Sequence, residues 1–447
     1  MPKSSSDLLN SLRHISGATP STIAQSPISP VKDAPKLTPV PQSKTVTASL
    51  DLTKHYDYAA LRGLKTGFSE TGPFNNYYFL SRQNMSSAIL ETDKGQKISF
   101  SGYNYLGLGN DPRVIDAVIA ATRQYGTHAG AARMVGGEIN LHRQLESNLA
   151  DFIGTDDCVV SVGGYSTNVS VISYLLESED LLIHDSYMHN SGVKGGILSQ
   201  AKRLSFAHND LEALEEMLKA YRDKSRRALI LVEGAYSMDG DILDLPKIIE
   251  LKKKYQAWLM VDEAHSIGVL GASGKGITEY WGVDPKEVDI IMGTLSKSFA
   301  SCGGFIGGSQ LLCDLLRNFA PGLLLYSTGI SPTNTASAHE ALNILRQEPE
   351  RVAKLISNAK FFCKTAKAKG LDIGEATGET PIVPVQIGQD MKAMTVASKL
   401  FDAGFLAHPI IYPVVPKNEA RIRFFITSLH TQTQIKDVLD LLAEYLG

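Results

Sequence analysis

The sequence has few cysteines and no pattern that would build a disulfide framework or a metal site. Its four cysteines lie far apart, form no C-x-x-C pair and have no histidine at metal-ligand spacing; they are Cys158, Cys302, Cys313 and Cys363. We therefore predict free thiols in a reducing compartment, and no bound metal.

Long apolar runs and a strong charge of one sign are also missing. No run approaches the roughly 20 residues of a membrane span, and the first residues lack the apolar core of a secretory signal. The net charge of -3 argues against a protein that binds nucleic acid by neutralising phosphates. We expect a soluble cytoplasmic protein with no membrane span and no nucleic-acid partner.

The composition is that of a globular protein with an atypical N-terminal segment. At 447 residues, 43% of them hydrophobic, the chain can bury a large core. Residues 1–48 are rich in Ser, Pro and Thr and contain no aromatic residue, which predicts a flexible tail. We expect an N-terminal arm with a hairpin over 49–100, a large domain over 101–330 and a small C-terminal αβ domain over 331–447.

Short apolar runs alternate with helical patterns along the predicted large domain. Strands are predicted over 158–162, 181–184, 228–233, 258–262, 288–292 and 304–307. Helices are predicted over 50–58, from Pro112, and over 141–153, 168–176, 211–221, 245–255, 335–346, 352–369 and 434–446. A hairpin is predicted over 86–101, and two C-terminal strands over 382–386 and 421–426. This alternation predicts an α/β fold with a doubly wound, mostly parallel sheet and ligand groups at strand ends.

One lysine lies in a segment rich in hydroxyl groups and glycines, GTLSKSFASCGGFIGG, over 293–308. Lys297 is flanked by Ser296 and Ser298, and Thr294 lies three residues before it. Most lysines are solvated charges on the surface, but a surface lysine rarely has three hydroxyl residues so close in the sequence. This arrangement suits an aldehyde cofactor that carries a phosphate, because the amine can form an imine while the hydroxyls hold phosphate oxygens.

An acidic residue and a histidine follow the predicted strand over 258–262. Asp262 would hold a pyridinium N–H, and His265 would point into the same crevice, although either alone could be structural. The Asp-Glu-Ala-His run also occurs in ATP-dependent helicases. A helicase needs G-x-x-x-x-G-K-[ST] upstream, whereas Gly274-Lys275 lies downstream and is followed by glycine. The helicase interpretation therefore fails.

Three further segments carry groups that could bind a ligand. His189 follows another predicted strand, and the segment over 163–168 joins a strand to a helix whose free N–H groups can bind phosphate. Near the C-terminus, Arg421 and Arg423 lie on one face of a predicted strand, where a guanidinium can bind a carboxylate. Each of these signals alone is also typical of structural residues.

Together these motifs resemble the α-oxoamine synthase family of fold-type I pyridoxal phosphate (PLP) enzymes. The resemblance runs from about Ser99 to the C-terminus. The matching stretches are NYLGLG, GYSTN, FAHND, EGAYSMDGDILDLP, VDEAHSIGVLGASGKGI, GTLSKSFASCGGFIGG and YSTGISP. It implies that the domain over 101–330 binds PLP, and that the enzyme condenses an α-amino acid with an acyl thioester, releasing CO2, free thiol and an α-aminoketone.

The resemblance also implies roles for single residues. Lys297 would carry the cofactor and remove the Cα proton, Asp262 would pair with the pyridine nitrogen, and His189 would stack on the ring. His265 would bond the cofactor oxygen or the acyl carbonyl. The remaining cofactor contacts would come from Gly164, Tyr165, Ser237, Thr294 and Ser296, and from Thr328 of the neighbouring subunit in a homodimer. Asn104 and Arg423 would hold the carboxylate of the amino acid.

Other interpretations remain open on the sequence. An aminotransferase or lyase on the same fold would share Asp262 and Lys297, whereas a catalytically silent subunit would have lost the lysine. The acyl group could be carried by coenzyme A or by an acyl carrier protein.

One departure from the family pattern concerns substrate choice. The family usually has Gly-Ser-Arg or Gly-Thr-Arg where this chain has Ala131-Ala132-Arg133. Because the hydroxyl residue lies near the amino-acid side chain in the family, we predict that Ala132 widens this pocket and admits donors larger than glycine. A panel of amino acids, each tested for the spectral change it induces in the cofactor, checks this. A response to glycine alone would contradict it.

Overall fold

The computed structural model describes residues 51–67, 78–86 and 88–447. The predicted tail over 1–48 lies outside the described residues. The chain divides into one unit that ends at Gly63 and a second unit from Leu64 to Gly447. Within the described residues, no helix has the length and apolar character needed to cross a lipid bilayer.

The first unit corrects the prediction of one helix over 50–58. A single 3-10 turn, η1 (Leu52–Lys54), is followed by helix α2 (Tyr58–Gly67), which crosses the boundary between the units. The Asp51 carboxylate accepts the N–H of Thr53, and His55 is extended at ψ 140°. An extended residue ends the turn, so the helix starts again only at Tyr58.

The second unit is built on a seven-stranded sheet with the order β4-β10-β9-β8-β7-β5-β6. Its strands are β4 (Asp157–Ser161), β5 (Leu181–Asp185), β6 (Lys202–Phe206), β7 (Ala228–Glu233), β8 (Trp258–Asp262), β9 (Ile290–Thr294) and β10 (Gly304–Gly308). Strands β6, β5, β7, β8 and β9 run parallel, whereas β10 is antiparallel to both β4 and β9. The predicted doubly wound, mostly parallel α/β sheet is therefore confirmed.

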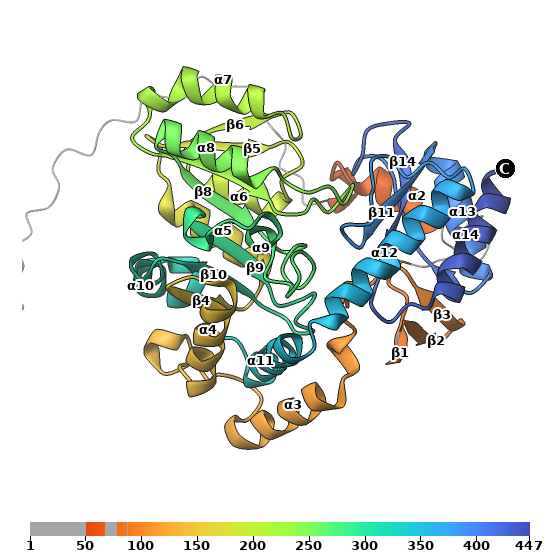
Figure 1. The fold of residues 1–447 in the computed structure, drawn as a ribbon, viewed down its shortest axis with the longest axis horizontal. Coiled ribbons are helices and arrows are strands. Elements are labelled where there is room, and N and C mark those ends of the chain that lie inside the picture. The colour runs from red at the N-terminus through yellow and green to blue at the C-terminus, as the bar shows by residue number, and fades with distance from the viewer. Residues whose placement is uncertain (1–50, 68–77, 87) are drawn as a thin grey trace, which may run out of the picture. The chain divides into compact units, whose positions relative to one another are not determined.

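Helices cover both faces of this sheet (Figure 1). The helices of this part of the chain are α3 (Pro112–Tyr125), α4 (Asn140–Ile153), α5 (Gly164–Leu175), α6 (Asn190–Leu198), α7 (Leu211–Tyr221), α8 (Leu245–Tyr255), α9 (Ile277–Trp281), α10 (Gln310–Phe319) and α11 (Pro332–Gln347). Helix α3 packs against α11 rather than on the sheet. Short turns are η2 (Leu108–Asn110), η3 (Arg133–Val135), η4 (Arg222–Lys224), η5 (Pro285–Glu287) and η6 (Pro321–Leu325).

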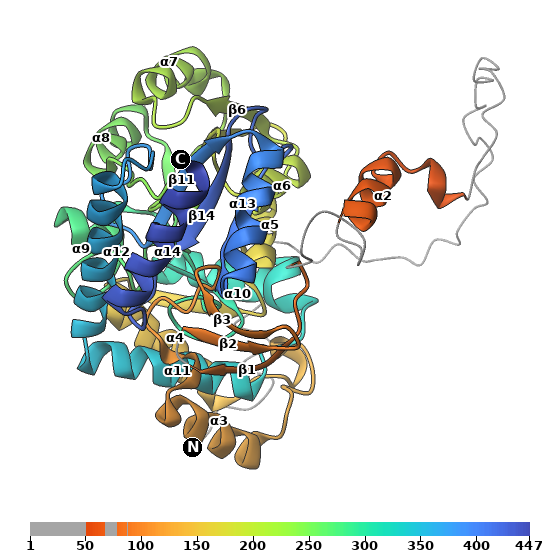
Figure 2. The same ribbon diagram turned by 90° about the vertical axis from the view of Figure 1, so that its right-hand side faces the viewer.

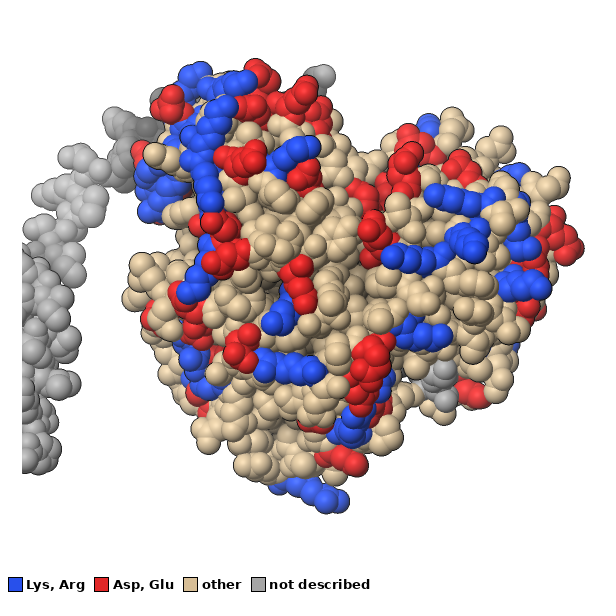
Figure 3. Space-filling view, in the orientation of Figure 1, with Lys and Arg blue, Asp and Glu red and all other residues tan. Residues whose placement is uncertain are grey.

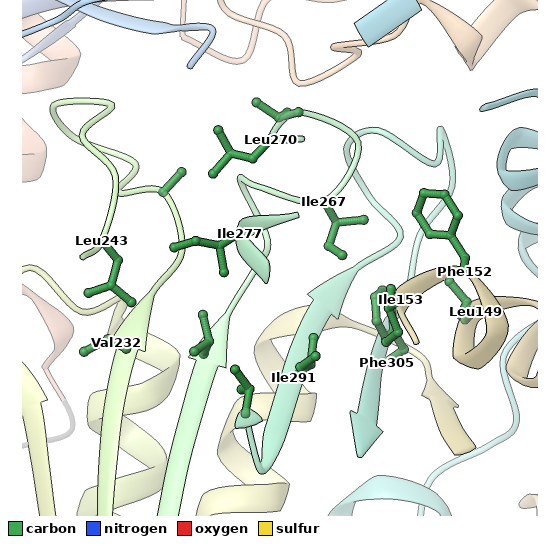
Figure 4. Close-up of a cluster of buried hydrophobic side chains, with 14 of the residues drawn as sticks. Leu149, Phe152, Ile153, Val232, Leu243, Ile267, Leu270, Ile277, Ile291 and Phe305 are labelled. Atoms are coloured by element: carbon green, nitrogen blue, oxygen red, sulfur yellow. The ribbon is translucent and has the colours of Figure 1, made fainter. Parts of the chain in front are cut away.

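Strand β7 contributes side chains to the hydrophobic clusters on both faces of the sheet. Leu229 and Leu231 belong to one buried cluster, which includes side chains of α5 and α10, whereas Ile230 and Val232 belong to another, which includes side chains of α4, α7 and α8. Successive side chains of a strand point to opposite faces, so an unbroken apolar run fits a sheet covered on both sides. Figure 4 shows part of the second cluster, in which Phe152 of α4 lies near the strands.

The C-terminal part forms a three-stranded sheet, β11-β14-β13, with β11 (Ile382–Gly388), β13 (His408–Ile410) and β14 (Ala420–Phe425). Helices α12 (Glu350–Ala368), α14 (Gln432–Leu446) and α13 (Asp390–Asp402) lie side by side over it (Figure 2). A four-stranded sheet pairs β1 (Arg82–Ser86), β2 (Ile89–Thr92), β3 (Gly95–Ser99) and β12 (Phe405–Leu406). Strands β2 and β3 form the predicted hairpin.

Charges of both signs are interspersed on the face drawn in Figure 3. One partly buried polar cluster surrounds His208. His208 is hydrogen-bonded to Asp185 at 2.9 Å and to Asp241 at 2.9 Å, and its ring stacks on Tyr187 at 4.2 Å. Burial opposes a charge on His208, but the bonds to the two carboxylates outweigh it and raise the pKa of His208 to about 10. The charged imidazole thus joins the end of β5 to the loop that follows β7.

We expect His208 to make the stability depend on pH. Because its pKa rises on folding, its contribution is fully present below pH 6.5 and is lost as the pH rises through about 10. Urea unfolding of the wild type and of His208→Gln should therefore differ by about 1–3 kcal/mol at pH 6.5 and by less near pH 10. The exposed His128→Gln variant is the control. A wild-type-to-variant difference that does not change with pH would contradict the assignment.

Candidate active site

A cavity of about 400 Å³ opens at the carboxyl ends of the central strands. Most of the predicted site residues line it, namely Gly164, Tyr165, His189, Ser237, Asp262, His265, Thr294, Ser296, Lys297 and Arg423. Parallel strands end at one edge of a sheet, so segments far apart in sequence deliver their side chains to the same crevice.

Lys297 follows the end of β9 and is half-buried in this cavity. Its Nζ lies 5.6 Å from the centroid of the Tyr103 ring. Burial lowers the pKa of Lys297 to about 8, although the carboxylate of Asp262 favours the charged form. A substantial fraction of neutral amine, which is the nucleophilic form, is therefore present near neutral pH.

Asp262 ends β8 and is buried at the base of the cavity. Its Oδ1 accepts the N–H of Ala264 at 3.0 Å, and its Oδ2 accepts an N–H of Asn168 at 2.7 Å. Glu233 lies beside it in register on β7. Burial and the charge of Asp262 raise the pKa of Glu233 well above its usual range. Glu233 therefore keeps its proton, whereas both oxygens of Asp262 accept from N–H donors.

His189 caps helix α6, and its hydrogen bonds define its tautomer. The backbone N–H of Ser191 donates to Nδ1 at 3.3 Å, and the Ser191 hydroxyl lies 2.6 Å from the same nitrogen. Since a backbone N–H can only donate, Nδ1 is an acceptor and the proton is on Nε2. Burial lowers the pKa of His189, with Lys297 adding to the effect. The ring is therefore neutral.

His265 is buried against two tyrosines, Tyr105 of the NYLGLG segment and Tyr103 directly before that segment. Its Nδ1 lies 2.8 Å from the hydroxyl of Tyr105, and its ring meets that of Tyr103 edge to face at 5.9 Å. Burial lowers the pKa of His265 well below its usual range, and the charges of Lys297 and Arg423 act in the same direction. His265 is thus a neutral hydrogen-bonding group.

Arg423 lies on β14, at the side of the cavity formed by the small C-terminal sheet. Its Nη1 donates to the backbone oxygen of Ser237 at 2.7 Å. Its buried Nε has no hydrogen-bond partner among the described residues. A guanidinium edge with an unused donor is suited to a carboxylate.

The N-terminus of α5 supplies a place for a phosphate. Gly163 precedes the helix and no side chain caps it, so backbone N–H groups of the first turn remain available to an anion. A Cβ added at Gly164 would lie 3.0 Å from Thr294 Oγ1, so glycine allows this close approach. The helix N-terminus, the amine of Lys297 and the charged Asp262 together fit the phosphate, aldehyde and pyridine nitrogen of PLP.

Three predicted site residues do not line the cavity. Asn104 faces the turn that follows it, where its Oδ1 accepts the N–H of Gly109 at 3.1 Å. Ala132 and Thr328 form an isolated antiparallel bridge with each other. Within the described chain, these two residues are brought together, but away from Lys297 and its neighbours.

The structure also places residues in the cavity that the sequence reasoning did not single out. They include Tyr103, Asn168, Ser191, Glu233 and Met292. Glu233 could have been found, because it ends a predicted strand beside the one that ends in Asp262. The pairing of Tyr105 with His265 spans 160 residues, and no local pattern could have indicated it.

A half-buried lysine, a strand-end carboxylate and an uncapped helix N-terminus on a doubly wound sheet fit a PLP enzyme of fold type I. Comparison with known proteins agrees. The model of the family "Aminotransferase class I and II" matches residues 95–442. The 8-amino-7-oxononanoate synthase of Petrotoga mobilis is 43% identical over 355 residues, which are 77% of this chain and 89% of that protein.

Solved structures give the same result. Serine palmitoyltransferase from S. paucimobilis, in a structure with bound PLP, has a TM-score of 0.83 at 28% identity, covering 89% of this chain and 98% of that one. The 8-amino-7-oxononanoate synthase of Francisella tularensis has a TM-score of 0.68 at 26% identity, covering 78% and 97%. The chain therefore belongs to the aminotransferase class I and II family and, within it, to the PLP-dependent α-oxoamine synthases.

The lowered pKa of Lys297 predicts how cofactor-free protein takes up PLP. Only a neutral amine attacks an aldehyde, so the rate of uptake should rise with pH and reach half its maximum near pH 8. Absorbance after mixing, measured from pH 6 to 10, gives this profile. Lys297→Ala should show no covalent phase. A wild-type midpoint near 10.5, the ordinary value for lysine, would contradict the burial argument.

Proposed function

We propose that this enzyme condenses L-alanine with a seven-carbon acyl thioester that ends in a carboxylate. The curated relatives are named for the product 8-amino-7-oxononanoate. That product has a methyl group beside its aminated carbon, as alanine supplies, and seven further carbons from its carbonyl to its carboxylate. Ala132 in place of a hydroxyl residue also favours a donor larger than glycine.

The atoms of this reaction balance. The Cα of alanine loses its proton and forms a bond to the acyl carbonyl carbon. The carboxyl group then leaves as CO2, its electron pair stays on Cα, and Cα takes up a proton again. The C–S bond of the thioester breaks and the thiol leaves with a proton. Bound PLP supplies an electron-accepting ring that makes the Cα proton acidic.

The residues of the cavity would divide the remaining work. Arg423 binds the carboxylate of the amino acid, because its buried Nε has no other partner in the described chain. The amine of Lys297 takes the Cα proton, which a pKa of about 8 permits near neutral pH. His265, neutral and held by Tyr105, donates from Nε2 to the acyl carbonyl oxygen. His189 packs against the cofactor ring, and Asp262 holds its pyridine N–H.

The remaining predicted residues would act across a homodimer. Thr328 would reach the phosphate in the partner subunit's site, and Ala132 would face the amino-acid side chain there. Their mutual pairing and their distance from their own cavity support this arrangement. Neighbouring Tyr326 is 83% exposed in the single chain, as expected of a surface that a partner covers.

The single observation that carries the proposal is the placement of Lys297, Asp262 and Arg423 around one cavity, with the Nε of Arg423 unpaired within the described chain. Product mass spectrometry tests it. Holoenzyme is incubated with alanine, serine or glycine and with acyl thioesters of different length, on coenzyme A and on a carrier protein. We expect release of CO2 and the α-aminoketone of alanine, and less than about 1% of this activity in Lys297→Ala.

Arg423→Lys separates binding from chemistry. Loss of the planar guanidinium should raise KM for the amino acid about 10- to 100-fold with a smaller change in kcat. The surface variant Lys399→Arg is the control. Transfer of the amino group to a keto acid without condensation would contradict the proposal and show an aminotransferase instead. A preference for serine would contradict alanine as the amino-acid donor.

A further inference from the structure

A polar chain of buried side chains connects Asp262 to His189 beneath the cavity. Asn168 of α5 donates one amide hydrogen to Asp262 Oδ2 at 2.7 Å and the other to Ser191 Oγ at 2.9 Å. The Ser191 hydroxyl lies 2.6 Å from His189 Nδ1. Asn168 and Ser191 are 1% and 0% exposed, so water does not compete for these bonds.

The direction of every bond in this chain is determined. An amide rotated by half a turn would place its oxygen against the Asp262 carboxylate, where neither atom could donate. The Ser191 oxygen accepts from Asn168, so its own hydrogen is available to His189 Nδ1. The chain therefore holds His189 with its proton on Nε2 while it stabilises the charge of Asp262.

The carbonyl oxygen of Asn168 is buried without a hydrogen-bond partner among the described residues. An unpaired buried oxygen is unfavourable, so packing for its own sake does not explain the residue. Gly195 of α6 makes the arrangement possible, because a Cβ there would lie 3.0 Å from the backbone oxygen of Asn168. The close approach of the two helices brings Ser191 within reach.

We propose that Asn168 is a positioning residue that sets the orientation and charge of Asp262 directly and, through Ser191, favours one tautomer of His189. This rests on the proposed roles of Asp262 and His189 toward the cofactor. Besides His189, the titratable groups of the described chain that interact with Asp262 include Glu233 of β7, the adjacent Glu263, and Lys297 after β9. None of these replaces the amide, because the amide alone joins Asp262 to Ser191.

Two variants of Asn168 separate this role from simple packing. Asn168→Asp keeps the shape, but its carboxyl group can donate to Asp262 only while protonated. Its affinity for PLP should therefore approach that of the wild type at pH 5.5 and fall at least 10-fold relative to it by pH 8.5. Asn168→Ala lacks the donor at every pH, so its affinity should be about 10- to 100-fold weaker throughout. Equilibrium titration with PLP over this pH range measures both.

A second measurement does not depend on the cofactor. Cofactor-free protein labelled with 15N-histidine should show the His189 ring as the neutral Nε2–H tautomer at pH 7, with the signal assigned by its loss in His189→Asn. In Asn168→Ala the Ser191 hydroxyl no longer accepts from the amide and can turn to accept from Nδ1, and in Ser191→Ala this hydroxyl is gone. Both variants should therefore raise the fraction of the Nδ1–H tautomer, opposed only by the backbone N–H of residue 191 at 3.3 Å. Thr167→Ser, on the same helix, is the control.

The proposal is overturned if the PLP affinity of Asn168→Asp parallels that of the wild type from pH 5.5 to 8.5. It is equally overturned if His189 keeps its tautomer in both Asn168→Ala and Ser191→Ala. Should Asn168→Ala not fold, the Asn168→Asp profile and the Ser191→Ala spectrum decide. Neither readout involves alanine or a thioester, so an error in the substrates proposed above would leave these results unchanged.

Discussion

The charge of one buried carboxylate organises this structure. An ionised Asp262 at the end of β8 is costly to bury unless donors surround it. The structure provides the N–H of Ala264 and the amide of Asn168, and it keeps the neighbouring Glu233 protonated. Because Asp262 is buried, its carboxylate acts strongly on the amine of Lys297, and in the proposed complex it would act on the pyridinium nitrogen as well.

Much of the large sheet could be predicted, because strands that are covered on both faces appear in the sequence as short, unbroken apolar runs. The bounds of β7 and β8 agree with the sequence prediction, residue for residue. Strand β6 (Lys202–Phe206) was missed because it is an edge strand whose first two residues are exposed and charged. Helix α6 was missed as well, since three glycines in NSGVKGGIL weaken any helical pattern.

The candidate site likewise has a part that the sequence predicts and a part that depends on tertiary packing. Lys297, Asp262 and His265 follow strand ends in the sequence, and parallel strands bring such ends together. The chain of Asn168, Ser191 and His189 depends instead on the distance between α5 and α6, which local sequence does not encode. The bond from Tyr105 to His265 depends on how a segment far along the chain packs. Ala132 and Thr328 form a bridge outside the cavity, which is a property of tertiary structure.

The central claim is that Lys297 holds PLP at the strand edge that Asp262 organises. Borohydride reduction of the holoenzyme, followed by proteolysis and peptide mass spectrometry, tests it most directly, because reduction makes the lysine–cofactor bond permanent. The account predicts one modified peptide, spanning Gly293 to Gly308, with the cofactor on Lys297. A cofactor on another lysine, or no modified peptide from protein that contains PLP, would contradict it.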